Sequence, residues 1–289
     1  MRLAILASEE SWYYRDLARA AVDHGHHVER WDFPQITAMV RTGAETFAVG
    51  EAAASDVDAV IVRTMPPGSL EHVVVRMDWL ARLEASGVQV INPPKALECA
   101  VDKYLTTARL SAAGLPVPDT VVCESPEAAR TAFDQLGGDV VVKPLFGAEG
   151  RGIVRVSDPD LAQRVFFTLS RMQSVLYLQR FIDHGGSDVR VLVLDGKVLG
   201  GMRRISPNDF RTNVSRQAHA EPHQPTDQEC EWAQRAVAAT GAVFAGVDIL
   251  YDRDGSGYVI EVNAVPGWKA FARTNQLDVA DVFVRCLSR

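Results

Sequence analysis

The sequence lacks several features that would mark a particular class of protein. Its four cysteines (Cys99, Cys123, Cys230 and Cys286) are far apart and lack the spacing of a metal site, so we expect reduced thiols in a cytoplasmic protein. No apolar run approaches the roughly 18 residues of a membrane span. The apolar run within residues 1–7 is too short for a secretory signal. We therefore expect no membrane partner.

Positive charge is also scarce. The chain has 30 Lys and Arg residues against 37 Asp and Glu residues, a net charge of -7. A nucleic-acid backbone would be repelled by this excess of negative charge, so we expect no nucleic-acid partner, although a local basic patch stays open. With 289 residues, of which 47% are hydrophobic, the chain is long and apolar enough for a sizeable core and predicts about two domains.

The first part of the chain alternates apolar strands with amphipathic helices. Strands are predicted at residues 2–7, 28–33, 57–62 and 88–91, and helices at 16–24 and 70–85. Such alternation is typical of βαβ units and a parallel sheet. Asn92-Pro93-Pro94 then breaks the pattern, and we place a domain boundary there.

The remainder of the chain mixes helices and strands less regularly. Its predicted helices cover residues 100–113, 126–136, 161–169, 226–240 and 279–287. Its predicted strands cover residues 119–122, 140–143, 153–156, 174–180, 189–194 and 198–205.

Two apolar segments near the end of the chain, 246–250 and 258–263, predict a hairpin around a turn rich in Asp and Gly. Asp248, Glu261 and Asn263 are the strongly polar side chains inside these strands. Residues two apart on a strand share a face, and hairpin pairing can bring Asp248 beside the other two. Two carboxylates and an amide oxygen suit Mg²⁺ and leave positions for phosphate oxygens. The alternative is a solvated sheet face.

Lys143 ends an apolar strand directly before a glycine-rich loop at residues 146–152. Glycines let backbone N–H groups approach an anion, and a lysine at the base of the loop would neutralise a phosphate. The P-loop pattern is absent, and no helix follows the glycines as it does in a dinucleotide fingerprint. These features predict a flap over nucleotide phosphates, with an ordinary hairpin and a surface lysine as the alternative.

Arginines gather within a short stretch of this acidic chain. They are Arg203, Arg204, Arg211 and Arg216. Guanidinium groups suit phosphate and carboxylate oxygens, so the stretch is either an anion site or a solvated loop.

The pair His219 and His223 lies in a predicted loop bounded by prolines, and we interpret it as surface. Trp268 either lines a substrate pocket or packs in the core.

In this order the motifs resemble the ATP-grasp enzymes and, among them, the RimK-like amino-acid ligases. The resemblance covers residues 95–289, and the N-terminal part resembles the leading domain of that family. It is carried by Asp102-Lys103, Val142-Lys143-Pro144, Gly147 to Gly152, Gln179 to Ile182, Asp188-Val189-Arg190, Arg203-Arg204, Asp209 to Asn213, Gly246 to Ile249 and Glu261 to Gly267. The resemblance implies an α/β and α+β protein with an ATP-grasp fold. Its parts would be an N-terminal parallel-sheet (pre-ATP-grasp) domain at 1–92, a small lobe with the flap at 93–182 and a C-terminal lobe with the metal site at 183–289.

The resemblance also implies roles for individual residues. The ATP-binding residues would be Lys103, Lys143, Gly147, Gly150, Gly152, Gln179, Arg180, Phe181, Ile182, Asp188, Arg211, Thr212 and Asn213. Among them, residues 179–182 would offer their backbone to adenine, and Asp188 would contact the ribose. The ligands of Mg²⁺, as two ions with Mn²⁺ as an alternative, would be Asp248, Glu261 and Asn263. The catalytic residues would be Arg211 and Arg204, the latter stabilising a tetrahedral oxyanion.

The activity that the resemblance implies is an ATP-dependent acid–amino-acid ligase. ATP would phosphorylate a carboxylate, and an amine would attack the acylphosphate while the flap excludes water. The partners would be L-glutamate or a similar amino acid and a carboxylate acceptor, either a small cofactor or the C-terminus of a peptide or protein. A small-molecule kinase and a non-catalytic nucleotide-binding regulator are the alternatives. The acceptor, the number of amino acids added and a homo-oligomeric state stay open.

The chain departs from the family pattern at two places. Gln217-Ala218 follows Arg216 where relatives often carry two glycines, and Arg180 stands where an acidic residue is common. The first departure puts recognition of the acceptor in question.

Overall fold

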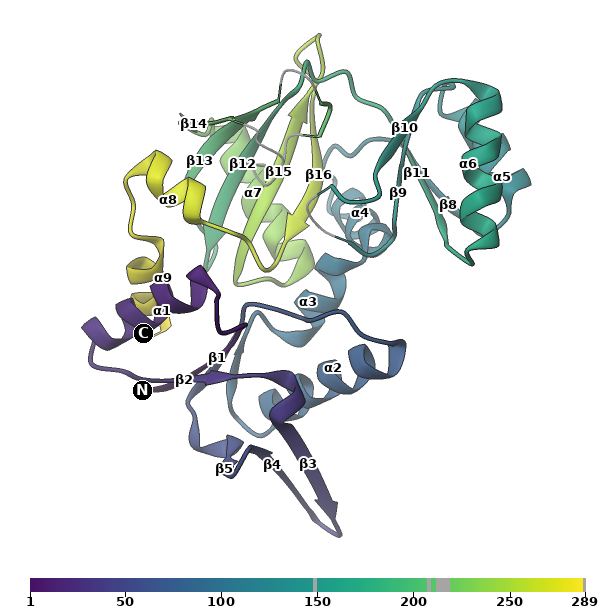
Figure 1. The fold of residues 1–289 in the computed structure, drawn as a ribbon. Helices are drawn as coiled ribbons and strands as arrows, with labels where there is room; N and C mark the ends of the chain where they lie inside the picture. The colour runs from purple at the N-terminus through teal and green to yellow at the C-terminus, as the bar shows by residue number, and fades with distance from the viewer. Residues whose placement is uncertain (148–149, 207–208, 212–218, 288–289) are drawn as a thin grey trace.

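A computed structural model describes the chain except for residues 148–149, 207–208, 212–218 and 288–289. Its N-terminal part is built on a parallel sheet in the order β2-β1-β6-β7, as the alternating pattern predicts (Figure 1). The strands are β1 (Arg2–Leu6), β2 (His27–Trp31), β6 (Ala59–Val62) and β7 (Gln89–Ile91). Helices α1 (Trp12–Asp23) and α2 (Leu70–Ala85) cover its two faces: Leu3 and Ile5 of β1 pack with α1, and Ala4 and Leu6 pack with α2.

A small antiparallel sheet, absent from the sequence prediction, projects from this part (Figure 1). It consists of β3 (Ile36–Arg41), β4 (Ala44–Val49) and β5 (Ala52–Ala53), flanked by the 3₁₀ turns η1 (Phe33–Gln35) and η2 (Ala54–Asp56). Gly43 turns β3 into β4 at φ 76, a conformation that glycine adopts without strain.

The single helix predicted at 100–113 is wrong. The structure has two helices there, α3 (Pro94–Val101) and α4 (Lys103–Ala112). Asp102 separates them in an extended conformation, and its carboxylate accepts a hydrogen bond of 2.9 Å from the amide of Leu105. This N-cap satisfies an amide at the start of α4 and turns the chain.

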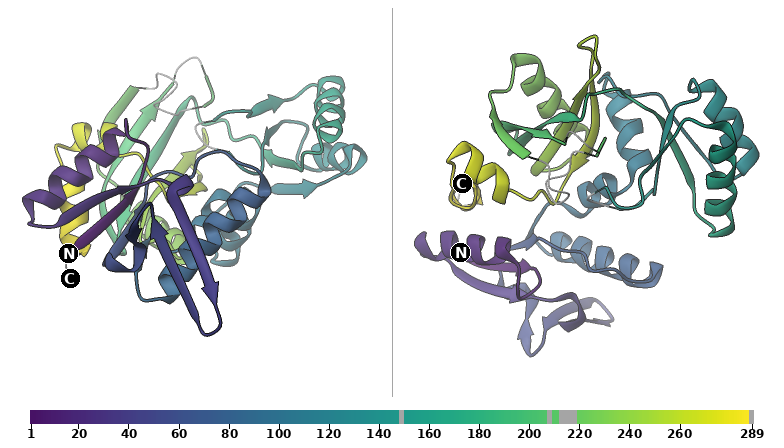
Figure 2. Two further views of the ribbon diagram at one scale, coloured as in Figure 1. Left: turned by 60° about the horizontal axis from the view of Figure 1, so that its bottom comes forward. Right: turned by 45° about the horizontal axis from the view of Figure 1, so that its top comes forward.

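The small lobe is an antiparallel sheet in the order β10-β9-β11-β8 with two helices packed on it. Its elements are β8 (Thr120–Cys123), α5 (Pro126–Gln135), β9 (Val140–Lys143), β10 (Val154–Val156), α6 (Pro159–Arg171) and β11 (Leu176–Arg180). Phe133 and Phe166 pack edge to face in its core, with ring centroids 6.4 Å apart. Figure 2 shows this lobe standing apart from the N-terminal part.

The large sheet has the order β14-β13-β12-β15-β16, with neighbouring strands antiparallel. Its elements are β12 (Ser187–Leu194), β13 (Lys197–Ile205), β14 (His219–His223), β15 (Phe244–Tyr251) and β16 (Gly257–Asn263), with α7 (Asp227–Thr240) on one face. The loop predicted around His219 and His223 is wrong, because both residues belong to edge strand β14. His219 is exposed, and His223 Nε2 lies 2.8 Å from Glu229 Oε2.

The C-terminal helices return to the N-terminal part. They are α8 (Lys269–Asn275), which was not predicted, and α9 (Val279–Leu287), which packs against α1. In both views of Figure 2 the yellow C-terminal helices lie beside the purple helix α1. Because α9 lies in the predicted C-terminal lobe but packs against α1 of the N-terminal part, the division of the chain at residues 92 and 182 stays a prediction. Within the ranges described above, no helix combines the length and the apolar character needed to cross a membrane.

Candidate nucleotide and metal site

The three predicted metal ligands lie side by side on one face of the large sheet. Asp248 on β15 is opposite Glu261 on β16, and Gly246 is opposite Asn263. Residues that are opposite in register, or two apart on one strand, share a face of the sheet. The structure therefore brings the two carboxylates and the amide together, as the hairpin pattern predicted.

Two arginines hold the Asp248 carboxylate. Arg190 on β12 donates from Nε and Nη2 to its two oxygens, at 2.6 Å each. Arg204 on β13 lies 2.9 Å away and also pairs with both oxygens of Asp188. Burial alone would raise the pKa of Asp248, but the two guanidinium groups lower it below its ordinary value. Asp248, only 2% exposed, is thus ionised and held in one orientation.

The donor set fits Mg²⁺. Among the described residues, none donates a hydrogen bond to the Glu261 carboxylate, and Asn263 Oδ1 accepts one bond of 2.9 Å from the amide of Val265. Each carboxylate or amide oxygen has two lone pairs, so Asp248 and Asn263 retain capacity for a cation. Oxygen ligands of this kind are those that Mg²⁺ takes in proteins, together with substrate phosphates.

Lys143 and Lys103 face this trio from the small lobe. Lys143, at the end of β9, donates to Gln179 Oε1 at 2.6 Å, and Lys103 donates to the carbonyl of Gly147 at 2.8 Å. Desolvation of its ammonium group, against the attraction of Glu261 and together with the repulsion of nearby Lys103, lowers the pKa of Lys143 to about 8. Desolvation also lowers the pKa of Lys103. A bound polyanion would stabilise the charged form of these two partly desolvated ammonium groups.

The loop between β9 and β10 requires glycine at three positions. Gly147, Gly150 and Gly152 have φ values of 149, 68 and 71, which a side chain would strain. Phe146 at its start is 61% exposed. The lysine, the glycine loop and the two flanking strands are therefore arranged as predicted for a flap, although residues 148–149 lie outside the described part of the chain.

The segment predicted to contact adenine leaves one amide open. The amide of Arg180 donates to the carbonyl of Asp119 at 2.9 Å, and that of Phe181 donates to the carbonyl of Asp139 at 3.0 Å. No described residue accepts from the amide of Ile182. Of these three amides, only that of Ile182 is available to a base.

The other predicted contacts are less fully defined. Asp188 is 2% exposed, and its carboxylate pairs with an arginine on the same sheet face. Arg211 is half-buried and pairs with Asp209 at 2.7 Å. Thr212 and Asn213 lie outside the described residues. Contacts of Asp188 with ribose and of Arg211 with phosphate stay predictions.

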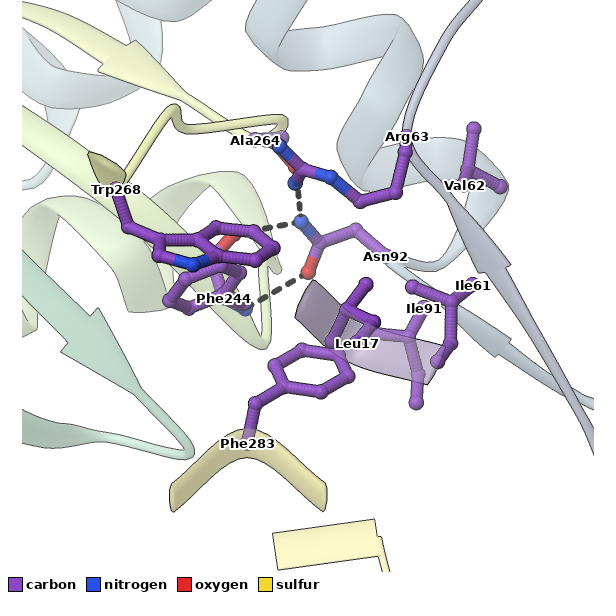
Figure 3. Close-up of a pocket in the computed structure, with 10 residues that line it drawn as sticks. All are labelled: Leu17, Ile61, Val62, Arg63, Ile91, Asn92, Phe244, Ala264, Trp268 and Phe283. Atoms are coloured by element: carbon purple, nitrogen blue, oxygen red, sulfur yellow. Dashed lines mark hydrogen bonds between the residues drawn. The ribbon is translucent and has the colours of Figure 1, made fainter. Parts of the chain in front are cut away.

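The sequence reasoning gave no role to two groups that shape this site. Arg190 belongs to the motif Asp188-Val189-Arg190, and its charge within an apolar strand was the feature that could have indicated a buried ion pair. Asn92 was assigned only to a domain boundary, but it is 2% exposed and joins the N-terminal part to the large sheet. Its Nδ2 donates to the carbonyls of Phe244, at 2.6 Å, and Ala264, and its Oδ1 accepts from the amide of Phe244 at 2.8 Å (Figure 3). Its Oδ1 also accepts from the amide of Val243 at 2.7 Å.

Two family models match the chain. The RimK PreATP-grasp domain matches residues 1–97, and the RimK-like ATP-grasp domain matches residues 100–287. Together they confirm the predicted fold class and the leading domain.

Curated relatives are similar over most of the chain. A tetrahydromethanopterin:alpha-L-glutamate ligase of Methanosarcina acetivorans is 36% identical over 85% of this chain and 80% of its own length. A probable alpha-L-glutamate ligase of Thioalkalivibrio sulfidiphilus is 32% identical over 97% and 93%.

Solved structures share the fold. The ATP-grasp ligase PsnB complexed with a minimal precursor superposes with a TM-score of 0.78 at 22% identity, covering 99% of this chain and 98% of PsnB. A RimK domain protein from Sphaerobacter thermophilus superposes with a TM-score of 0.76 at 22% identity and the same coverage.

Proposed function

We propose that this chain, which belongs to the RimK-like ATP-grasp family, joins L-glutamate to a carboxylate of a small acceptor. Its membership of that family makes it an ATP-dependent carboxylate–amine ligase. The observation that carries the proposal is that the oxygen-only trio lies on one face of the sheet and that the ammonium groups of Lys143 and Lys103 interact with the charge of Glu261. The relatives named as glutamate ligases support glutamate, and the relative acting on tetrahydromethanopterin makes pterin-type carriers the first acceptors to test.

Asp248, Glu261 and Asn263 would hold Mg²⁺, as two ions. When bound, Mg²⁺ would neutralise the phosphate charge that shifts during phosphoryl transfer. Lys143 and Lys103 would bind the phosphates, and the glycine loop would cover them and exclude water from the acylphosphate. The open amide of Ile182 would donate to adenine. Asp188 would contact the ribose, as expected from the family.

Ligation then needs an activated carbonyl and a free amine. A carboxylate is a poor electrophile because its oxygen leaves badly, and phosphorylation converts that oxygen into a good leaving group. Arg211, which is half-buried, would contact the transferring phosphate, as expected from the family. The side chain of Arg204 is 3% exposed and engaged by two carboxylates, so it would act mainly by orienting Asp248. Such fixed charges stabilise a transition state without reorganising during the reaction.

The proposal is tested by incubating the protein with Mg-ATP, L-glutamate and a panel of pterin-type acceptors and short peptides. Ligation gives ADP, free phosphate and a product whose mass is that of acceptor plus glutamate minus water. Glu261→Ala should abolish turnover, whereas Glu71→Gln, at an exposed position of α2, should not. A phosphorylated acceptor without free phosphate would favour the small-molecule kinase instead.

A further inference from the structure

Arg63 carries a positive charge for which the described residues supply no carboxylate. It follows β6 directly, and its Nη2 donates to the carbonyl of Pro266 at 2.8 Å. Its Nε is buried without a hydrogen-bond partner. The guanidinium stands over the rings of Trp268, at 4.5 Å, and Tyr13, at 5.1 Å. Figure 3 shows the side chain reaching from the strand end toward Ala264, above Trp268.

The surroundings of Arg63 differ from those of the two enclosed arginines of the large sheet. Arg190 and Arg204 each pair with a carboxylate, which offsets the cost of removing their charge from water. Desolvation instead lowers the pKa of Arg63 to about 10. A half-buried cation held between aromatic rings with unused N–H groups is a favourable place for an incoming anion.

Arg63 also lies where open parallel sheets bind their ligands, at the carboxyl ends of the strands. Ile5 on β1 is in register with both Arg30 on β2 and Ile61 on β6. Arg63 is two residues beyond Ile61, so Arg30 and Arg63 share one face of the sheet on either side of β1. Arg30 donates to the carbonyl of Ala7 at 3.2 Å and, among the described residues, pairs with no carboxylate. Two cations therefore flank the end of β1.

This edge is close to the metal trio. Pro266, which accepts the bond from Arg63, is three residues after Asn263, a stretch of chain that spans at most about 11 Å. The hydrogen bond from Asn92 to Ala264 fixes the same loop. A Cβ on Gly267 would approach the Tyr13 hydroxyl to 2.5 Å, so the loop is packed tightly against α1. Arg63 is thus held at a fixed distance from the reaction centre.

The cavity beside Arg63 has a volume of about 10 Å³ and is lined by Asn92, Ala264 and Trp268 among others (Figure 3). It has room for one water molecule at most, so a substrate would meet the guanidinium from its exposed side. Trp268 itself is 1% exposed and donates to Asp16 at 2.9 Å, which shows that it packs in the core.

We propose that Arg63, supported by Arg30, binds a substrate carboxylate that stays ionised throughout the reaction. The carboxylate that reacts loses its charge when it becomes an acylphosphate and then an amide, so a fixed cation suits a carboxylate that does not react. Three groups have this chemistry: the α-carboxylate and the γ-carboxylate of the entering glutamate, and a second carboxylate on the acceptor. The proposal rests on the ligase function above and names the substrate group that the N-terminal sheet recognises.

The test compares Arg63→Met, Arg63→Lys and the control Arg82→Met, which removes an exposed arginine paired with Glu45. Initial rates are measured against each substrate in turn. Arg63→Met should raise KM about 10- to 100-fold for the substrate whose carboxylate it binds, the loss of one charge-assisted bond. Arg63→Lys should recover part of this loss. The KM for Mg-ATP and the melting temperature should stay near those of Arg82→Met.

Modified substrates identify which carboxylate Arg63 binds. Whichever carboxylate Arg63 binds, its ester (glutamate α-methyl ester, glutamate γ-methyl ester or an acceptor esterified at its second carboxylate) should show a raised KM in the wild type and little further loss in Arg63→Met. Equal KM values for all three esters and their parent acids in the wild type would overturn the proposal. Unchanged substrate KM values in Arg63→Met would do the same. Absence of any ligation by the wild type would instead defeat the proposed function.

Discussion

Replacing Lys143 by arginine should abolish the uptake of a proton that accompanies nucleotide binding. Desolvation lowers the pKa of Lys143 to about 8 in the free protein. The negative phosphates of ATP would favour the ammonium form and raise this pKa, so the complex would hold more protons than the free protein. Binding should then take up about half a proton near pH 8 and about 0.9 of a proton near pH 9.

The sign of the pH effect follows from this uptake. Because the bound state is the more protonated one, affinity for Mg-ATP should be constant below about pH 7 and fall as the pH rises through 8. The dissociation constant should increase about fivefold between pH 8 and 9. Titration calorimetry without acceptor, in two buffers of different ionisation enthalpy, measures both the affinity and the proton uptake.

Arginine keeps its charge across this range, so Lys143→Arg should flatten the profile. Lys197→Arg, at an exposed position of β13, should keep the wild-type profile. A Lys143→Arg profile with the wild-type slope would place the proton on another group, first of all Lys103, whose pKa is also lowered. Absence of proton uptake by the wild type near pH 9 would refute the reasoning about the desolvated ammonium group.

Two further predictions concern stability. Asn92→Ala should lower the free energy of unfolding by about 3 kcal/mol, because it leaves buried backbone groups unpaired, whereas Gln89→Ala on the exposed side of β7 should change it little. Denaturant unfolding measures both, and a loss below about 0.5 kcal/mol for Asn92→Ala would contradict the bonding described. Burial would raise the pKa of Glu229, but hydrogen bonds from Thr226 and His223 lower it below its ordinary value of 4.5. The stability that this carboxylate contributes is present above pH 4.5 and is lost as the pH falls below that value. The melting temperature of Glu229→Gln should therefore be lower than that of the wild type at neutral pH, and the difference should shrink on acidification. A difference that stays constant with pH would contradict this role of Glu229.

The parts of the structure that follow local rules could be predicted from the sequence. The parallel sheet follows from strands alternating with helices, and the trio follows from the two-residue period of a strand. The break at Asp102 escaped prediction because the helical pattern continues on both sides, and only the side-chain cap at Leu105 separates the two helices.

Other elements depend on contacts that no local pattern reveals. Strand β3 was missed because five of its six residues are exposed, which removes the apolar alternation of a half-buried strand. Strand β14 contains Pro222 and resembled a loop, but it is an edge strand, where a missing amide is tolerated. Asn92 and Arg63 meet partners about 150 to 200 residues away, so neither could be placed from the sequence.

Isotope transfer from the acceptor tests the central claim most directly. An acceptor to which the protein adds L-glutamate in the ligation screen is labelled with ¹⁸O in its reacting carboxylate. It is then incubated with the protein, Mg-ATP and L-glutamate. Because one carboxylate oxygen leaves with the phosphoryl group, the free phosphate should carry one ¹⁸O for each amide formed, together with one ADP. Unlabelled phosphate, or AMP and pyrophosphate in place of ADP and phosphate, would contradict an acylphosphate formed at this site.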